Sequence, residues 1–389
     1  MENVFITKIA LEEKLRNLEP LQIELSNDCR KHLILTGKNG SGKTTLLEEL
    51  GNYLSALEDY RNSAIQINAL LGEDSNDIKM NGMEINEKTT VEFNYQQYIP
   101  AFGKEIIRIM FRSERWFRPS IPKSIEKYDI TKEKTDGNSN YSYNIVIYML
   151  NLYFQLSYSE SEEERSRIQS WLANFESALQ DIYNCPQLKL RLDAKALTVR
   201  IEMPGYPPFS LNEMADGYSA LVSIVAELIM RMDTGNAVVD YLRQGIVLID
   251  EVETHLHVEL QKKVLPFLTR MFPNVQFIVT THSPFVVTSL ADAVVFDMEK
   301  RERLENLSAY SYETIIEAYF DTDMYSDRMR SLLDRYQELS KKDRTAEESE
   351  EFLKAQAELE LVPPAAKELY IAYRSIEATR KAGQNDKDQ

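Results

Sequence analysis

The sequence predicts an α/β fold in which helices cover a mostly parallel sheet. Short apolar runs typical of buried strands alternate along the chain with longer amphipathic segments typical of helices. The run Gly245–Asp250 is apolar up to its terminal acid, as in a central parallel strand. A glycine-rich stretch joins another such strand directly to a helix, which is the order expected of a phosphate-binding turn.

That glycine-rich stretch, Gly37–Thr44, reads GKNGSGKT and matches the P-loop pattern G-x-x-x-x-G-K-[ST]. The run 33–35 before it predicts a strand, and the run 45–50 after it predicts a helix. Glycines let backbone N–H groups surround a phosphate chain, and the helix N-terminus adds partial positive charge. We expect Lys43 to reach the β- and γ-phosphates and the Thr44 hydroxyl to hold Mg²⁺. The expected nucleotide contacts are Lys38, Asn39, Gly40, Ser41, Gly42, Lys43, Thr44 and Thr45.

The other expected elements follow in order along the chain. Alternation predicts strands at 4–11, 21–25, 89–95 and 106–111, with a polar, undefined region at 59–88. Two prolines and the polar run 131–140 mark a boundary. Helices are expected at 143–158, 162–171 and 172–183, and the strictly alternating runs 188–192 and 197–201 predict a hairpin that returns to the core. A helix at 215–232, a strand at 245–250, a helix at 255–271 and strands at 275–279 and 293–296 complete the series.

These elements predict four parts. An ATPase-type core begins at 1–118, an inserted helical lobe occupies 119–185, the core resumes at 186–300, and a charged helical region fills 301–389. In that last part, Met329, Leu332, Leu333, Tyr336 and Leu339 share one helical face, and Leu369, Ala372, Tyr373 and Ile376 repeat the pattern. Such faces serve either subdomain packing or association with a partner. The tail from Lys381 is polar and expected to be disordered.

Two further motifs contain the residues that nucleotide hydrolysis would need beside the P-loop. The strand 246–249 ends in Asp250 and Glu251, the pattern of a Walker-B strand. Asp250 would hold Mg²⁺ through water, while Glu251 would orient or deprotonate the attacking water. The strand 275–279 runs into His282, which can contact the γ-phosphate at the sheet's carboxyl edge. Glu251, His282 and Lys43 are therefore the candidate catalytic residues, and Thr44 and Asp250 the candidate metal ligands.

A fourth motif opens the helix before the Walker-B strand. Met214, Ala215, Asp216 and Gly217 stand at its start, where backbone N–H groups are free for a phosphate. The alternative is an ordinary helix start with Asp216 as the capping residue.

Together these motifs, over residues 1–300, resemble the ABC-type ATPases of the SMC-like and OLD-like branch. Within that branch they resemble the stand-alone ATPases of antiphage defence, such as PtuA of Septu and AriA of PARIS. The segments Asp250–His257 and Thr280–Pro284 carry the resemblance most specifically. It implies a P-loop NTPase core that binds ATP and Mg²⁺, and two copies that sandwich ATP.

In that arrangement each P-loop is capped in trans by the partner's Ala215, Asp216 and Gly217. The family's usual serine is Ala215 here, so slow hydrolysis is expected. In this family a Q-loop residue couples the nucleotide to the helical lobe. Its candidates here are Gln96, Gln97 and the basic stretch 112–115.

The resemblance further implies an ATPase that assembles on ATP and regulates a separately encoded effector, such as a nuclease. A RecF-like DNA-repair ATPase and a transporter ATPase subunit are the alternatives. The segment between P-loop and signature is too short for SMC arms, and no zinc hook occurs. The last 90 or so residues are helical rather than strand-rich, which argues against a Toprim nuclease in this chain.

Composition narrows the partners and the compartment. The net charge of −17 does not favour nucleic acid, so such contact needs a local patch or a partner protein. Two cysteines form no disulfide framework, and the first residues lack a signal-peptide pattern, so a cytoplasmic location is expected. The apolar stretch 143–158 is too short and too polar to cross a membrane.

Overall fold

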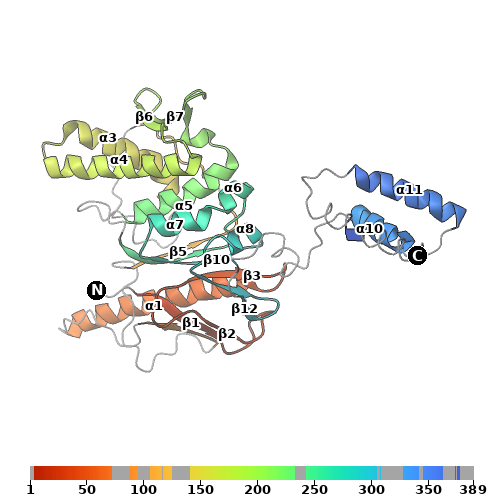
Figure 1. Ribbon diagram of the computed structural model, residues 1–389. Helices are drawn as coiled ribbons and strands as arrows, with labels where there is room; N and C mark the ends of the chain where they lie inside the picture. The colour runs from red at the N-terminus through yellow and green to blue at the C-terminus, as the bar shows by residue number, and fades with distance from the viewer. Residues whose placement is uncertain are drawn as a thin grey trace. The chain divides into compact units, whose positions relative to one another are not determined.

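A computed structural model describes residues 4–71, 88–94, 106–115, 117–124, 141–232, 242–304, 307, 327–340, 345–361, 373 and 375–376. The chain forms two compact units, residues 1–312 and 313–389 (Figure 1). The boundaries predicted near 118, 185 and 300 divide the chain more finely and stay predictions. Among the described residues, no helix combines the length and apolar character needed to cross a membrane.

The first unit is built on a six-stranded sheet with the order β12-β11-β3-β10-β9-β5. Its first five strands along the chain run parallel, and β12 is antiparallel to β11. The α/β fold predicted from the sequence is thus confirmed. The strands are β3 His32–Thr36, β5 Ile106–Phe111, β9 Gln244–Ile249, β10 Val275–Thr280, β11 Ala293–Asp297 and β12 Glu302–Leu304.

A long helix, α1 Lys43–Leu71, packs between this sheet and a second, antiparallel sheet (Figure 1). The second sheet has the order β2-β1-β4. Leucines of α1 spaced three or four residues apart share one core with both sheets, namely Leu46, Leu47, Leu50, Leu54 and Leu57. The helix continues well past Asp59, where the sequence suggested an undefined polar region. The strands are β1 Ile6–Leu11, β2 Leu21–Glu24 and β4 Thr89–Phe93.

The opposite face of the six-stranded sheet is covered by helices (Figure 1). They are α5 Asp216–Met232, α6 Val258–Gln261, α7 Val264–Met271 and α8 Pro284–Val287. The single helix predicted over 255–271 is wrong. The loop 250–257 precedes α6, with Glu251 and His255 at positive φ, and a break at Lys262 and Lys263 separates α6 from α7. The tertiary setting of that loop, rather than a glycine or proline signal, delays the helix.

A helical lobe lies above α5 in Figure 1. It contains the 3₁₀ helix η1 Tyr141–Asn144, α3 Ile145–Tyr158 and α4 Glu162–Tyr183. The sequence predicted two helices that meet at residue 171, but α4 is one unbroken helix. Ile168, Trp171 and Phe175 lie on its buried face. The predicted hairpin forms, as β6 Lys189–Asp193 and β7 Thr198–Glu202. It pairs with β8 Phe209–Ser210 in a separate three-stranded sheet instead of joining the central one. The 3₁₀ helix η2, Leu211–Glu213, follows β8.

The second unit contains α10 Asp327–Ser340 and α11 Ala346–Glu360. The face predicted for α10 is confirmed, since Leu333, Tyr336 and Leu339 are buried against residues of α11. Of the repeat expected at 369–376, Tyr373 and Ile376 join this cluster, while Leu369 and Ala372 lie outside the described residues. The tail from Lys381 lies outside them as well.

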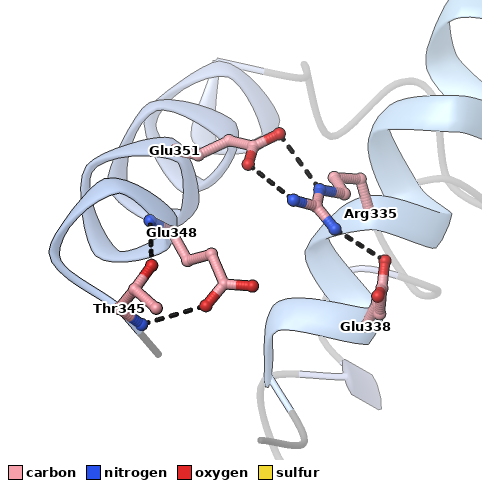
Figure 2. A network of polar contacts seen from close by, with 5 residues as sticks. All are labelled: Arg335, Glu338, Thr345, Glu348 and Glu351. Atoms are coloured by element: carbon pink, nitrogen blue, oxygen red, sulfur yellow. Dashed lines mark hydrogen bonds and ion pairs between the residues drawn. The ribbon is translucent and has the colours of Figure 1, made fainter. Parts of the chain in front are cut away.

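Polar contacts also join these two helices (Figure 2). Arg335 of α10 makes a bidentate pair with Glu351 of α11 at 3.0 and 2.8 Å and contacts Glu338 at 2.8 Å. These hydrogen bonds raise the pKa of Arg335. Thr345 and Glu348 form a reciprocal capping box at the start of α11. The capping box fixes where α11 begins.

Candidate functional site

The candidate site lies at the carboxyl ends of three adjacent strands. β10 pairs in parallel with β3 on one side and with β9 on the other. Parallel strands end at the same edge of a sheet, so the segments that follow them meet there. The P-loop follows β3, Asp250 and Glu251 follow β9, and His282 follows β10. The structure therefore brings together three motifs that lie far apart in the sequence.

The P-loop leads from β3 into the first turn of α1. Gly37, Gly40 and Gly42 have φ values of +129°, +82° and +92°, a backbone region that favours glycine. A Cβ on Gly42 would lie 2.9 Å from the Leu18 side chain, so this position also lacks space. The loop is thus shaped by its glycines, and it ends at a helix N-terminus that favours anions.

Lys43 is buried within the loop it belongs to. Its Nζ donates to the carbonyl oxygens of Gly37 at 2.8 Å and Lys38 at 3.0 Å. Burial lowers the pKa of Lys43, and the nearby carboxylates of Glu253 and Glu251 oppose that shift. An ammonium in this position can exchange its carbonyl partners for phosphate oxygens.

The Walker-B aspartate is tied to the P-loop helix by a hydroxyl. Thr44 Oγ1 lies 3.0 and 3.1 Å from the two carboxylate oxygens of Asp250. The buried Thr280 hydroxyl donates to Asp250 Oδ1 at 2.7 Å and fixes the carboxylate from β10. Carboxylate and hydroxyl oxygens are ligands that Mg²⁺ accepts. The donor set present here fits that ion.

Glu251 follows Asp250 in an unusual backbone conformation, with φ at +45°. Its N–H donates to Thr280 Oγ1 at 2.7 Å, and its carbonyl accepts from Arg115 Nη2 at 2.8 Å. Thr280 thus contacts both neighbouring acids. Sequence reasoning gave neither Thr280 nor Arg115 a role at these acids, although Arg115 lies in the basic stretch considered for the Q-loop. The other candidates, Gln96 and Gln97, lie outside the described residues.

His282 faces the same cavity as Glu251. Its backbone N–H donates to Glu253 Oε1 at 2.6 Å, so Glu253 fixes the segment that carries the imidazole. Burial, followed by the positive charge of Lys43, lowers the pKa of His282. The neutral imidazole is therefore the favoured form, and it can accept or donate one hydrogen bond.

The motifs enclose a cavity of about 280 Å³. Residues 16–18, which come from the loop between β1 and β2, contribute a wall that the sequence did not predict. Arg16 stands at φ +53°, within a tight turn closed by hydrogen bonds between Leu15 and Leu18. The lining residues are Arg16, Asn17, Leu18, Asn39, Gly40, Gly42, Lys43, Thr44, Thr45, Glu251 and His282. Lys38 and Ser41 are not among them, and Lys38 forms an ion pair with Glu299 at 3.2 Å.

The predicted signature residues do not line this cavity. α5 begins at Asp216, so Asp216 is the first residue of the helix and not the capping residue before it. A Cβ on Gly217 would lie 2.9 Å from the carbonyl oxygen of His255. Gly217 therefore packs against the loop that follows the Walker-B acids, and none of the three residues lines the cavity of the same chain's P-loop.

Comparison with known proteins places these features in a family. The family model described as "AAA domain, putative AbiEii toxin, Type IV TA system" matches residues 33–288, from the P-loop strand to just beyond His282. The chain belongs to this family. In this AAA domain the matched region contains the P-loop, both Walker-B acids and the predicted signature.

Relatives of this AAA domain include PtuA of Septu, one of the two defence ATPases that the sequence resembles. Septu protein PtuA of Bacillus mycoides is 32% identical over 136 residues, which are 32% of this chain and 19% of that protein. PtuA of Bacillus thuringiensis is 25% identical and covers 66% of this chain and 67% of its own length. A protein named "Retron Vc95 probable ATPase", from Vibrio cholerae, is 27% identical over 34% of this chain and 28% of its own length. The expected resemblance to stand-alone defence ATPases is confirmed.

Among solved structures, the SMC head bound to the C-winged helix domain of ScpA is similar over 79% of this chain and all of its own. The identity is 14% and the TM-score 0.42, so the fold assignment rests on the strand order and P-loop described above.

Proposed function

We propose that this AAA domain binds ATP with Mg²⁺ and hydrolyses it to ADP and phosphate. One observation carries the proposal: the P-loop threonine, Thr44, lies within 3.1 Å of the carboxylate oxygens of Asp250, and Glu251 and His282 line the same cavity. A phosphate-binding loop, a pair of oxygen ligands and a carboxylate base are the parts that nucleotide hydrolysis requires. The retron relatives, which are named probable ATPases, support the same proposal.

Each part has a role in this proposal. The backbone N–H groups of residues 38–45 and the Lys43 ammonium bind the phosphates and offset their charge. Thr44 and Asp250 would hold Mg²⁺, which supplies charge neutralisation to the phosphate chain. Glu251 orients the attacking water and accepts its proton. The neutral imidazole of His282 hydrogen-bonds near the γ-phosphate and loses that contact after hydrolysis.

We further propose that a second copy of the chain completes the site. Ala215, Asp216 and Gly217 do not line the cavity of their own P-loop, and amide groups at the N-terminus of a 17-residue helix suit a phosphate of the partner's nucleotide. Ala215 supplies no hydroxyl, so turnover is slow. As the PtuA resemblance implies, the ATP-bound assembly regulates a separately encoded effector in antiphage defence.

Lys43→Ala tests nucleotide binding. The variant loses two charge-assisted contacts to phosphate, so ATP affinity should fall by more than about 100-fold in calorimetry. Lys8→Ala removes a lysine that pairs on the surface of β1 with Glu92 and serves as the matched control. Undiminished ATP affinity in Lys43→Ala would refute the P-loop assignment.

Glu251→Gln tests hydrolysis and assembly together. The amide cannot accept the proton, so phosphate release should fall by about 100-fold or more, while ATP stays bound. The ATP-bound variant should elute as a dimer or larger species in size-exclusion chromatography. Glu259→Gln makes the same change at an exposed site on α6 and should behave as wild type. Wild-type turnover by Glu251→Gln would show that another group is the base.

A further inference from the structure

Arg115 is a buried arginine directed at the backbone of the two Walker-B acids. It lies in the loop after β5 and is 6% exposed. Its Nη1 donates to the carbonyl oxygen of Asp250 at 2.6 Å and to that of Arg112 at 2.9 Å. Its Nη2 donates to the carbonyl oxygen of Glu251 at 2.8 Å. One guanidinium therefore spans two consecutive carbonyls of the site.

These bonds complete a set that fixes the peptide units around Glu251. The N–H of Asp250 donates to the Phe111 carbonyl at 2.8 Å, and the N–H of Glu251 donates to Thr280 Oγ1 at 2.7 Å. Every backbone polar group of the two acids is thereby paired. Glu251 has a positive φ of 45°, which is unfavourable for a residue with a side chain and needs surrounding contacts to hold it. The Arg115 guanidinium is the cationic member of those contacts.

A purely stabilising role explains this arrangement poorly. Burial lowers the pKa of Arg115 to about 10, and the carboxylates of Glu253, Asp250 and Glu251 oppose that shift, so the group stays charged at neutral pH. Among the described residues it forms no ion pair with a carboxylate, and its buried Nε has no hydrogen-bond partner there. An incompletely paired buried cation costs stability. A role in fixing the backbone of Asp250 and Glu251 explains why an arginine occupies this buried position.

We propose that Arg115 is a positioning residue that holds the backbone of Glu251 in the conformation from which its carboxylate faces the nucleotide cavity. The inference rests on the proposed hydrolysis, because Glu251 must be correctly placed to orient the attacking water. Both bonds are made to the chain's own carbonyl oxygens, so the inference also predicts how this backbone behaves when no nucleotide is added. The side chain acts through Glu251 and touches no phosphate.

The test compares Arg115→Met with Arg165→Met, which changes an exposed arginine of α4 that lies outside every motif of the site. Arg115→Met should lower kcat by about 10- to 100-fold, as expected when a reacting group is displaced by about an ångström. ATP affinity should stay within about twofold of wild type, because binding relies on the P-loop. Arg115→Lys restores one donor and should give an intermediate kcat. Arg165→Met should match wild type.

Two further measurements separate positioning from general damage. In the Glu251→Gln background, Arg115→Met should cause no additional loss of kcat, since a positioning residue has nothing left to position. Hydrogen exchange over residues 246–254 should quicken in Arg115→Met but not in Arg165→Met. This second readout needs no turnover and no nucleotide.

The outcomes distinguish the inference from the proposed function. Additive losses with Glu251→Gln, an equal loss of affinity and kcat, or a wild-type kcat in Arg115→Met would each overturn the positioning role. A wild-type chain that binds ATP without hydrolysing it would refute the proposed function instead. In that case unchanged hydrogen exchange in Arg115→Met would refute the backbone contact as well, and faster exchange would support it.

Discussion

Replacing Thr280 by valine removes a hydroxyl that forms hydrogen bonds with both Walker-B acids. The side chain is fully buried, and valine preserves its shape. The change deletes a hydrogen bond to the Asp250 carboxylate at 2.7 Å and leaves the Glu251 N–H without its acceptor at 2.7 Å. A hydrogen bond to a charged group contributes about 1.5–3 kcal/mol, and an orphaned buried donor costs about 1–3 kcal/mol. Because one hydroxyl makes both contacts, we expect a loss of about 2–4 kcal/mol rather than their full sum.

Thr36→Val is the matched control. Thr36 ends β3, is 3% exposed, and its hydroxyl has no hydrogen-bond partner among the described residues. Replacing that hydroxyl by a methyl group should leave the free energy of unfolding unchanged or raise it slightly. Both tryptophans of the chain fall in the first unit, so urea unfolding followed by tryptophan fluorescence reports that unit. If the two variants differ by less than about 0.5 kcal/mol, the reasoning about Thr280 is refuted.

Two other predictions concern pH and the second unit. His32 is half-buried and its Nδ1 accepts a backbone hydrogen bond at 3.1 Å, and this burial lowers its pKa from 6.5 to about 4. The unfolded chain therefore takes up this proton first, so stability is complete above pH 6.5 and falls by about 3 kcal/mol as the pH approaches 4. His32→Gln keeps an acceptor and should lose that part of the pH dependence in urea unfolding at pH 7 and 4.5, whereas an unchanged slope would contradict the assignment. Leu339→Ala, at a fully buried position, should cost the second unit about 2–4 kcal/mol. Hydrogen exchange in α11 should then quicken while the tryptophan transition stays in place, and a shifted transition would show that the two units unfold together.

The elements that the sequence predicted best are those whose signal is local. The P-loop strand, the Walker-B strand and the 188–201 hairpin are short, strongly patterned and bounded by clear changes in composition. The errors have local causes too. The split at residue 171 had no glycine or proline behind it, and the spacing of Ile168, Trp171 and Phe175 already favours one helix. The end of α1 was predicted too early because residues 58–63 are mostly polar.

Other features have no local signal at all. The sequence of the segment 250–257 gives no sign that Glu251 and His255 adopt positive φ values. The helix was therefore predicted to begin at residue 255, whereas α6 begins at Val258. The loop at Arg16 borders the cavity although it lies outside every recognised motif. The alternating hairpin could have extended the central sheet, and only its pairing with β8 showed that it forms another.

The sequence by itself determined which residues can carry the chemistry. A P-loop needs its glycines, lysine and threonine within eight positions, and two adjacent acids at a strand end are a pattern of neighbours. Only the tertiary structure decided how these groups meet. It places β10 between β3 and β9, sets Thr44 against Asp250 across 206 residues, and closes Arg115 onto the same aspartate's carbonyl across 135. Such contacts follow from strand order and burial, which depend on the packing of the whole core and not on any one stretch of chain.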